Sequence, residues 1–364
     1  MEIESTETLR AVLAAGTPLD GLRLQSLDLT GVEDELLARD PAGAVVLGGV
    51  LTRRLEHHLR DGGALVFPAV TDCPVDPYRS SLYTAEDLYA GLDDDYAATP
   101  DARAYAWSKD ASGRHDVLAT MLRAVHDDSI SDALVEALAG LSVVGVMGGH
   151  ALRRGTAGYA DAAHLGRALA RAGHLVLTGG GPGAMEAANL GARLAAADDA
   201  ALDDALTHLA AVPDFAPDVA AWAHLAFEVL SDHPAPHTPA SIGVPTWFYG
   251  HEPPNVFAGL VAKFFSNALR EDLLLVTVTA GIVYLPGAAG TVQELFQAAT
   301  PGYYSGDGGV PLVLMGREHW TRRLPAWDLL RALGSGRPLA ERLHLVDAAD
   351  DVDAAVAAVT PRRP

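Results

Sequence analysis

A glycine-rich turn and a carboxylate lie close together near residue 290. Residues 286–294 read Pro-Gly-Ala-Ala-Gly-Thr-Val-Gln-Glu, between an apolar run and a helix-forming run. This order predicts a strand, a tight turn through Gly287 and the start of a helix. The free N–H groups of Gly290 and Thr291 would bind an anion such as phosphate at the positive end of that helix. Glu294, one helical turn further on, would place an acid beside the anion.

Two further turns of this kind occur upstream. The apolar run 142–147 opens into Gly148 and Gly149, and the run 174–178 opens into a turn that contains Gly179, Gly180, Gly181 and Gly183. In an open parallel sheet such turns gather at the carboxyl ends of the strands, where ligands bind. We therefore expect the three turns to line one phosphate site. The plainer alternative is that glycines are needed where a helix crowds a strand.

The second turn also fits the dinucleotide-binding pattern G-x-G-x-x-[GA] through Gly179, Gly181 and Ala184. That pattern requires an acidic residue about 20 positions later, at the end of a second strand. The sequence offers no clear candidate, so dinucleotide binding is the less favoured alternative. Glu186, in the first turn of the following helix, could either cap that helix or contact a ligand.

Elements that alternate between strand and helix position these residues. From residue 142 onward the pattern is strand, glycine turn and helix, which predicts an α/β fold with a doubly wound, Rossmann-like parallel sheet. We assign residues 136–360 to this nucleotide-binding catalytic domain, with a helical insertion at about 197–235. In residues 1–135, short helical and strand-like runs alternate, which predicts an N-terminal α+β accessory region. No motif and no internal repeat is evident there.

Composition excludes several classes of protein. The net charge of −21 and the isoelectric point of about 4.9 argue against nucleic acid or an anionic membrane as a partner. A single cysteine, Cys73, rules out an intrachain disulfide and fits a reducing cytoplasm. No charged residue occurs between Asp272 and Glu294, but Pro286 and glycines interrupt this stretch, so a buried strand explains it better than a membrane span.

A metal site is not expected. His251 and Glu252, followed by Pro-Pro and Asn255, do not place two ligands on one face of an element. A loop that lines a nucleotide pocket is the better interpretation, with Trp247, Phe248 or Tyr249 near the base. For Lys263, an ion pair or solvent contact is favoured over a Schiff-base role.

The glycine motifs also carry a resemblance to a known family. Residues 179–192 and 286–294 resemble the LOG, or lysine-decarboxylase-like, family of nucleoside 5′-monophosphate phosphoribohydrolases. Residues 242–255 and 267–272 look nearest to its bacterial pyrimidine/purine nucleotide 5′-monophosphate nucleosidase branch. The resemblance covers roughly residues 140–350.

This resemblance implies hydrolysis of a nucleoside 5′-monophosphate such as AMP to a free base and ribose 5-phosphate, without metal or organic cofactor, in a homodimer or larger homo-oligomer. It implies catalytic roles for Glu294 and Arg270, and it favours a ligand-contacting role for Glu186. The usual Arg-Lys pair is Arg270-Glu271 here, and Ala288 replaces a glycine. The alternative is a protein of the same fold that binds a nucleotide or cofactor without catalysis.

Overall fold

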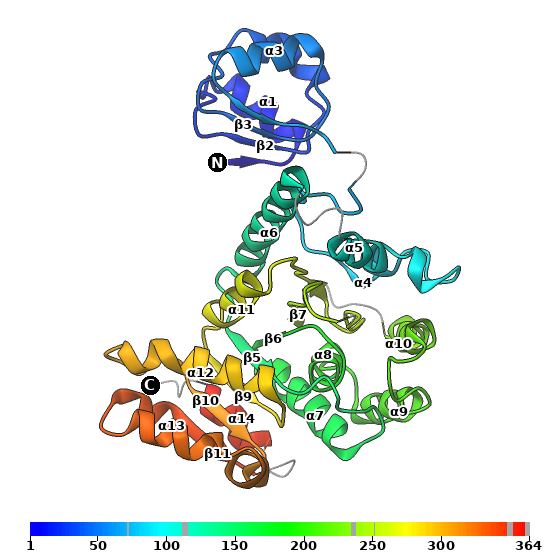
Figure 1. Ribbon diagram of the computed structural model, residues 1–364, viewed down its shortest axis with the longest axis vertical. Coiled ribbons are helices and arrows are strands. Elements are labelled where there is room, and N and C mark those ends of the chain that lie inside the picture. The colour runs from blue at the N-terminus through cyan, green and yellow to red at the C-terminus, as the bar shows by residue number, and fades with distance from the viewer. Residues whose placement is uncertain (71–72, 111–115, 234–237, 251, 348–351, 361–364) are drawn as a thin grey trace. The chain divides into compact units, whose positions relative to one another are not determined.

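The chain forms two compact units. The computed structural model describes residues 1–70, 73–110, 116–233, 238–250, 252–347 and 352–360 (Figure 1). The first unit comprises Met1–Ser81 with Arg114–Ala133, and the second comprises Leu82–Gly113 with Leu134–Pro364. The long helix α6 (Val117–Leu138) contributes residues to both. His251, considered above as a metal ligand, lies outside the described residues.

The second unit is built on a seven-stranded parallel sheet. Its strands lie in the order β11-β10-β9-β5-β6-β7-β8, and every neighbouring pair is parallel. The chain starts in the middle of the sheet, moves outward to β8, and returns to the other side of β5. This confirms the doubly wound fold and places a change of direction between β5 and β9, where ligands bind in such sheets. The strands are β5 (Val143–Met147), β6 (Leu175–Thr178), β7 (Ser241–Gly243), β8 (Leu260–Val261), β9 (Gly281–Tyr284), β10 (Leu312–Met315) and β11 (Leu343–Val346).

Burial explains why these strands are apolar throughout. Every residue of β5, β6, β9 and β10 is buried, as expected for a parallel sheet covered by helices on both faces. Two of the covering helices, α7 and α8, approach each other closely at glycines. A Cβ on Gly191 would lie 1.7 Å from the carbonyl oxygen of Ala163, and one on Gly166 would lie 2.0 Å from that of Ala188. The helices of this unit, apart from the end of α6, are α4 (Ala85–Tyr89), α5 (Pro100–Lys109), α7 (Ala157–Arg171), α8 (Ala184–Arg193), α9 (Asp199–Leu209), α10 (Val219–Asp232), α11 (Asn267–Val276), α12 (Ala289–Tyr304), α13 (Ala326–Gly334) and α14 (Val352–Val359).

The segment 82–110 packs onto the edge of this sheet. Tyr83 exchanges two backbone hydrogen bonds with Val261 of the edge strand β8, at 2.9 and 2.7 Å. Asp101, at the start of α5, is buried and accepts hydrogen bonds from Lys263 Nζ at 2.6 Å and from Trp247 Nε1 at 2.8 Å. Lys263 thus forms an ion pair. Burial lowers the pKa of its ammonium group, and the charge of Asp101 opposes this effect.

The first unit contains a repeat that the sequence did not reveal. Its strands β1 (Glu2–Ile3), β2 (Arg23–Gln25), β3 (Val45–Leu47) and β4 (Leu65–Phe67) pair in parallel and in chain order. The register aligns Glu2, Arg23, Val45 and Leu65, which follow one another after 21, 22 and 20 residues. Sequential parallel strands with a nearly constant spacing are typical of a solenoid.

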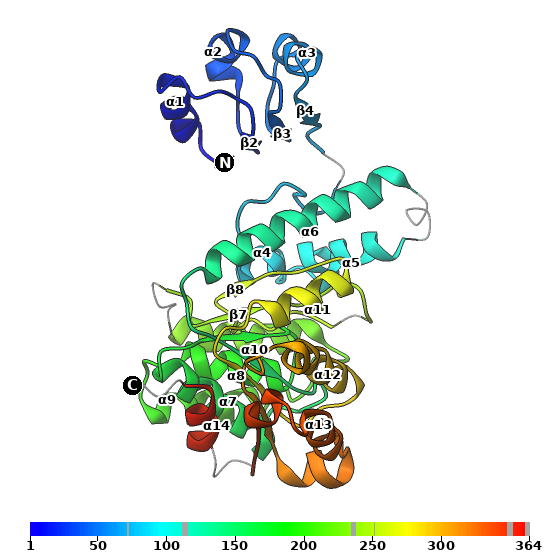
Figure 2. The ribbon, with the colours of Figure 1, turned by 90° about the vertical axis from the view of Figure 1, so that its left-hand side faces the viewer.

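Each of the first three strands of this repeat is followed by a helix. Figure 2 shows α1 (Thr6–Ala14), α2 (Glu33–Leu37) and α3 (Arg53–Asp61) in a row on one side of the small sheet. Their apolar residues and alternate strand residues such as Leu24 and Val46 share one core. The strands are only two or three residues long, so each repeat has few positions at which the sequence pattern can recur.

Candidate functional site

Hydrogen bonds join the turns that follow β5, β6 and β9. Gly149 donates its N–H to the carbonyl of Pro286, 3.2 Å away, and accepts from the N–H of Ala184 at 3.2 Å. A Cβ on Gly148 would lie 2.7 Å from that of Ala184. Gly183 has a φ of +75°, and a Cβ there would lie 2.6 Å from the Gly149 carbonyl oxygen. Gly148, Gly149 and Gly183 therefore let three turns meet at the carboxyl edge of the sheet.

Two hydrogen bonds from Asn255 hold the turn at 179–181 in place. Asn255 donates its backbone N–H to the Gly180 carbonyl at 2.8 Å and its side-chain Nδ2 to the Gly181 carbonyl at 3.1 Å. The N–H of Gly180 donates to Thr178 Oγ1 at 3.0 Å. Asn255 is itself buried. In the structure its side chain therefore positions the turn, and one amide of that turn already has a protein acceptor.

The N-terminus of α12 is open by comparison. Helices α7, α9, α10 and α11 each begin with a side-chain cap, whereas Ala288 provides none for α12. Within the described part of the chain, the N–H groups of Ala289, Gly290 and Thr291 have no protein acceptor. Ala288, Ala289 and Gly290 are exposed. This combination of free donors and a helix dipole is the usual binding site for a phosphate or carboxylate.

Gly287 and Thr291 shape this turn. A Cβ on Gly287 would lie 2.1 Å from Thr291 Oγ1, so a side chain at 287 would displace the threonine. Thr291 is buried, whereas the space around Gly290 is empty within 4 Å of a Cβ position. The two glycines therefore serve different needs: Gly287 permits close packing inside the turn, and Gly290 keeps its outer surface clear.

Arg270 and Glu294 meet beside this helix start. Arg270 belongs to α11, which lies next to α12 (Figure 1). Its Nη1 is 3.1 Å from Glu294 Oε1, and the two side chains are 11% and 12% exposed. Arg270 also donates Nε to the carbonyl of Val244 at 2.7 Å and Nη2 to the carbonyl of Gly179 at 3.4 Å. The guanidinium thus connects the acid to the ends of β7 and β6.

The pKa of Glu294 is raised by the surroundings of its carboxyl group. The largest cause is burial, which disfavours the charged form; Arg270 opposes it, and the negative charge of Glu271 adds to it. Glu271 is buried and accepts a hydrogen bond from Gln293. Tyr284 donates its hydroxyl to the backbone carbonyl of Glu294 at 3.3 Å, which ties this part of α12 to β9. A carboxyl group with a raised pKa can exchange a proton nearer to neutral pH, which suits general acid–base catalysis.

Glu186 has a partner outside the predicted set. Its carboxylate is paired with Arg154 through Nη2 and through Nε, the latter at 3.0 Å, and both side chains are 1% exposed. The guanidinium of Arg154 also lies 4.6 Å from the ring centroid of Trp222. The structure therefore gives Glu186 a buried ion pair at the start of α8, and its predicted contact with a ligand stays a prediction.

Sequence reasoning did not select several polar residues near these turns. His150, directly after Gly149, lies 3.5 Å from Glu252, measured from Nδ1 to Oε1. The Glu252 carboxylate lies 3.7 Å from the Cβ position of Gly181. Asn267 opens α11 one turn before Arg270 and donates its Nδ2 to the Tyr249 hydroxyl at 3.2 Å. In the sequence, His150 and Asn267 were marked only by their position close to Gly149 and Arg270. Such a position does not show whether a side chain contacts the site.

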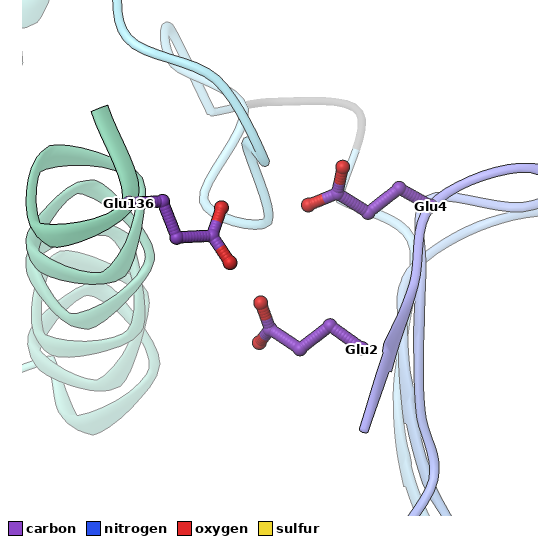
Figure 3. Close-up of side chains that lie close together, drawn as sticks. All are labelled: Glu2, Glu4 and Glu136. Atoms are coloured by element: carbon purple, nitrogen blue, oxygen red, sulfur yellow. The ribbon is translucent and has the colours of Figure 1, made fainter. Parts of the chain in front are cut away.

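One group of carboxylates was considered as a metal site. Figure 3 shows the side chains of Glu2, Glu4 and Glu136. Glu2 is already engaged by Arg23 within the first unit, at 2.5 Å, and Glu136 belongs to the second unit. Exposed acidic groups commonly gather without a metal, so we assign none here.

Among the described residues, no helix has the length and apolar character needed to cross a bilayer.

Comparison with known proteins covers part of the second unit. The model of the SLOG cluster4 family matches residues 141–198, which contain β5, α7, β6, α8 and the first two glycine turns. That segment is therefore similar to the SLOG family. The match does not extend to Arg270 or Glu294. No match was found among curated proteins.

Solved structures share similarity over a longer stretch. The molybdenum cofactor binding protein of the phototrophic bacterium Rippkaea orientalis is 15% identical, over 61% of this chain and 98% of that one, with a TM-score of 0.38. The molybdenum cofactor carrier protein of Chlamydomonas reinhardtii is 20% identical, over 60% of this chain and 96% of that one, with a TM-score of 0.37. Because these TM-scores are low, we assign the doubly wound fold of the second unit from the strand order of its sheet and not from these similarities.

Proposed function

We propose that this protein hydrolyses the N-glycosidic bond of nucleoside 5′-monophosphates, giving a free base and ribose 5-phosphate. The observation that carries the proposal is the position of the Arg270–Glu294 pair beside the open N-terminus of α12. An anion site and a carboxyl group with a raised pKa, one helical turn apart, suit a substrate whose reactive bond lies close to its phosphate.

In this mechanism the 5′-phosphate binds to the free N–H groups of Gly290 and Thr291. Binding energy from the phosphate, remote from the reacting bond, fixes the sugar and orients its anomeric carbon. The second and third glycine turns are joined through Gly149, so they would line the same side of the substrate. The predicted contacts of Gly148, Gly149 and the 179–183 turn with the substrate belong to this proposal.

Glu294 acts on the sugar. As the bond between C1′ and the base nitrogen breaks, positive charge develops on the ribose ring, and a carboxylate stabilises it. Water then adds to C1′: its hydroxyl group bonds to the carbon and its proton passes to Glu294. Glu294 releases this proton to solvent, and the departing base takes up one proton from solvent, so the carboxylate is regenerated. Arg270 holds the carboxylate in position through their ion pair and is itself held by the carbonyls of Val244 and Gly179. No step requires a metal or an organic cofactor.

The test is the release of free base. Purified protein is incubated with AMP, GMP, CMP and UMP, with the matching nucleosides, and with di- and triphosphates, and the products are separated by chromatography. We expect base and ribose 5-phosphate from monophosphates, and their loss in Glu294→Gln. Glu228→Gln, which changes an exposed carboxylate in α10, is the matched control and should retain activity.

Two results would overturn the proposal. If Glu294→Gln keeps full turnover, the carboxylate has no part in catalysis. If monophosphates bind but emerge intact from the wild-type protein, the alternative of a non-catalytic nucleotide- or cofactor-binding protein is correct.

A further inference from the structure

We infer that Asn267, together with Phe248 and Tyr249, forms a base-recognition subsite that selects bases carrying an exocyclic amino group, such as adenine and cytosine. The inference rests on the proposed function, because it takes a nucleoside monophosphate as the ligand. It adds a specificity-determining residue and a substrate class.

The first observation is an unpaired amide oxygen. Asn267 is 9% exposed, and its Nδ2 donates to the Tyr249 hydroxyl at 3.2 Å. Its Oδ1 is buried and has no donor among the described residues. A buried acceptor without a donor is destabilising, and native proteins seldom leave one. Oδ1 belongs to the same amide as the Nδ2 that contacts Tyr249, so the acceptor without a donor lies within one amide group of that ring.

The second observation is an exposed aromatic pair on a fixed loop. Phe248 and Tyr249 are each 53% exposed, and their rings pack edge to face with centroids 5.2 Å apart. Trp247, immediately before them, is buried and bound to Asp101. Lys109 donates to the Phe248 carbonyl. Exposed rings on an anchored backbone suit stacking against a nucleobase, a contact that tolerates any base because every base has a flat aromatic face.

The third observation is the position relative to the acid. Asn267 and Arg270 are three residues apart on α11, so their Cβ atoms lie about 5–6 Å apart on one face of the helix. Arg270 contacts Glu294 at 3.1 Å and the carbonyl of Val244, where the chain leaves β7 towards Phe248 and Tyr249. A base at Tyr249 would therefore extend from a sugar whose anomeric carbon faces Glu294.

Chemistry then decides which base fits. Asn267 Nδ2 is engaged by Tyr249, so the free atom is an acceptor and requires an N–H donor from the base. Adenine and cytosine present such a donor in their amino group, whereas hypoxanthine and uracil present a carbonyl oxygen at the same position. Two acceptors facing each other would leave both unpaired, which disfavours the oxo bases.

The test is binding, measured by calorimetry on the full chain. AMP and IMP, and CMP and UMP, differ in the group that should meet Asn267. Ribose 5-phosphate serves as the probe without a base. The ligands are titrated into Glu294→Gln, which is not expected to consume them, and into the same background carrying Asn267→Ala or Tyr249→Ala.

We expect AMP to bind about tenfold or more tightly than IMP, with the same order for CMP over UMP. Asn267→Ala should remove this discrimination and leave the affinity for ribose 5-phosphate unchanged. Tyr249→Ala should weaken AMP and IMP alike. Equal affinities for AMP and IMP, a preference for IMP, or discrimination that survives Asn267→Ala would each overturn the inference while the proposed function stands. If neither nucleotides nor ribose 5-phosphate bind, both proposals fail.

Discussion

Gln293 donates a hydrogen bond from Nε2 to Oε2 of Glu271, 2.5 Å away. This contact fixes a second, buried carboxylate on α11 close enough to Glu294 for its charge to raise the pKa of Glu294. Burial acts in the same direction, and Arg270 acts in the opposite one. Burial is the largest cause of the raised pKa of Glu294, and two neighbouring residues of one helix with opposite charges modify it.

Glu271→Gln should move the pH profile of nucleotide hydrolysis. In the proposed mechanism Glu294 works in its ionised form, so activity falls as the pH drops through its raised pKa. The acid limb of kcat/KM should therefore lie above the ordinary glutamate pKa of about 4.3. Removing the like charge of Glu271 favours ionisation of Glu294 and should shift that limb to lower pH. A limb that stays in place would show that Glu271 does not act on Glu294.

Replacement of Arg270 should reduce catalysis more than substrate affinity. Arg270→Met removes the charge that orients Glu294, and we expect kcat to fall at least ~10²-fold. Arg270→Lys retains the charge but cannot make the same three contacts. Its kcat should therefore lie between that of the wild-type protein and that of Arg270→Met. The measurement is steady-state kinetics with AMP, accompanied by ribose 5-phosphate titrations. Loss of ribose 5-phosphate binding in both variants would indicate that Arg270 builds the turn and has no separate role in catalysis.

The neighbouring residues Arg153 and Arg154 should differ sharply in their effect on stability. Arg154→Met leaves the buried carboxylate of Glu186 without a partner, which costs about 3–5 kcal/mol in the free energy of unfolding. Arg153→Met breaks an exposed pair with Asp214 and should cost less than about 1 kcal/mol.

Tryptophan fluorescence during urea denaturation provides the measurement for these two variants. All five tryptophans lie in the second unit, so the signal reports the unit that contains both arginines. Equal midpoints for the two variants would contradict the assigned role of the buried pair.

Two glycines of the α12 turn provide a matched pair. Gly287→Ala would bring a Cβ to 2.1 Å from Thr291 Oγ1, so the turn must rearrange and the midpoint of unfolding should fall. Gly290→Ala meets no atom within 4 Å and should leave the midpoint unchanged or slightly higher, because alanine favours a helix over glycine. Thermal unfolding of both variants checks this. A larger loss of stability at position 290 would be inconsistent with the described turn.

The sequence by itself determined the doubly wound parallel sheet of the second unit. Runs such as 281–285 are apolar because strands of a parallel sheet are buried on both faces, and the glycine turns mark where those strands end. These signals are local, so they can be read without knowing what packs where. The same signals located the Pro286–Glu294 segment. For the region before Arg270, the prediction of a helix from the spacing over 257–269 was wrong, because this stretch contains β8 and the helix α11 begins only at Asn267. The role of Arg270 was implied by the family resemblance.

Only the tertiary structure decided which predicted donors stay free. Gly149, Gly180 and Ala184 donate their N–H groups to protein acceptors, whereas the first amides of α12 have no acceptor among the described residues. The partner of Glu186 was likewise undetermined, since Arg154 precedes it by 32 residues and many arginines could have reached it. Contacts between segments distant in sequence depend on complementary shape and charge across the fold, and a linear pattern does not record them. The solenoid of the first unit escaped detection for a related reason: its strands of two or three residues carry their repeat in three-dimensional register, which few identical residues reveal.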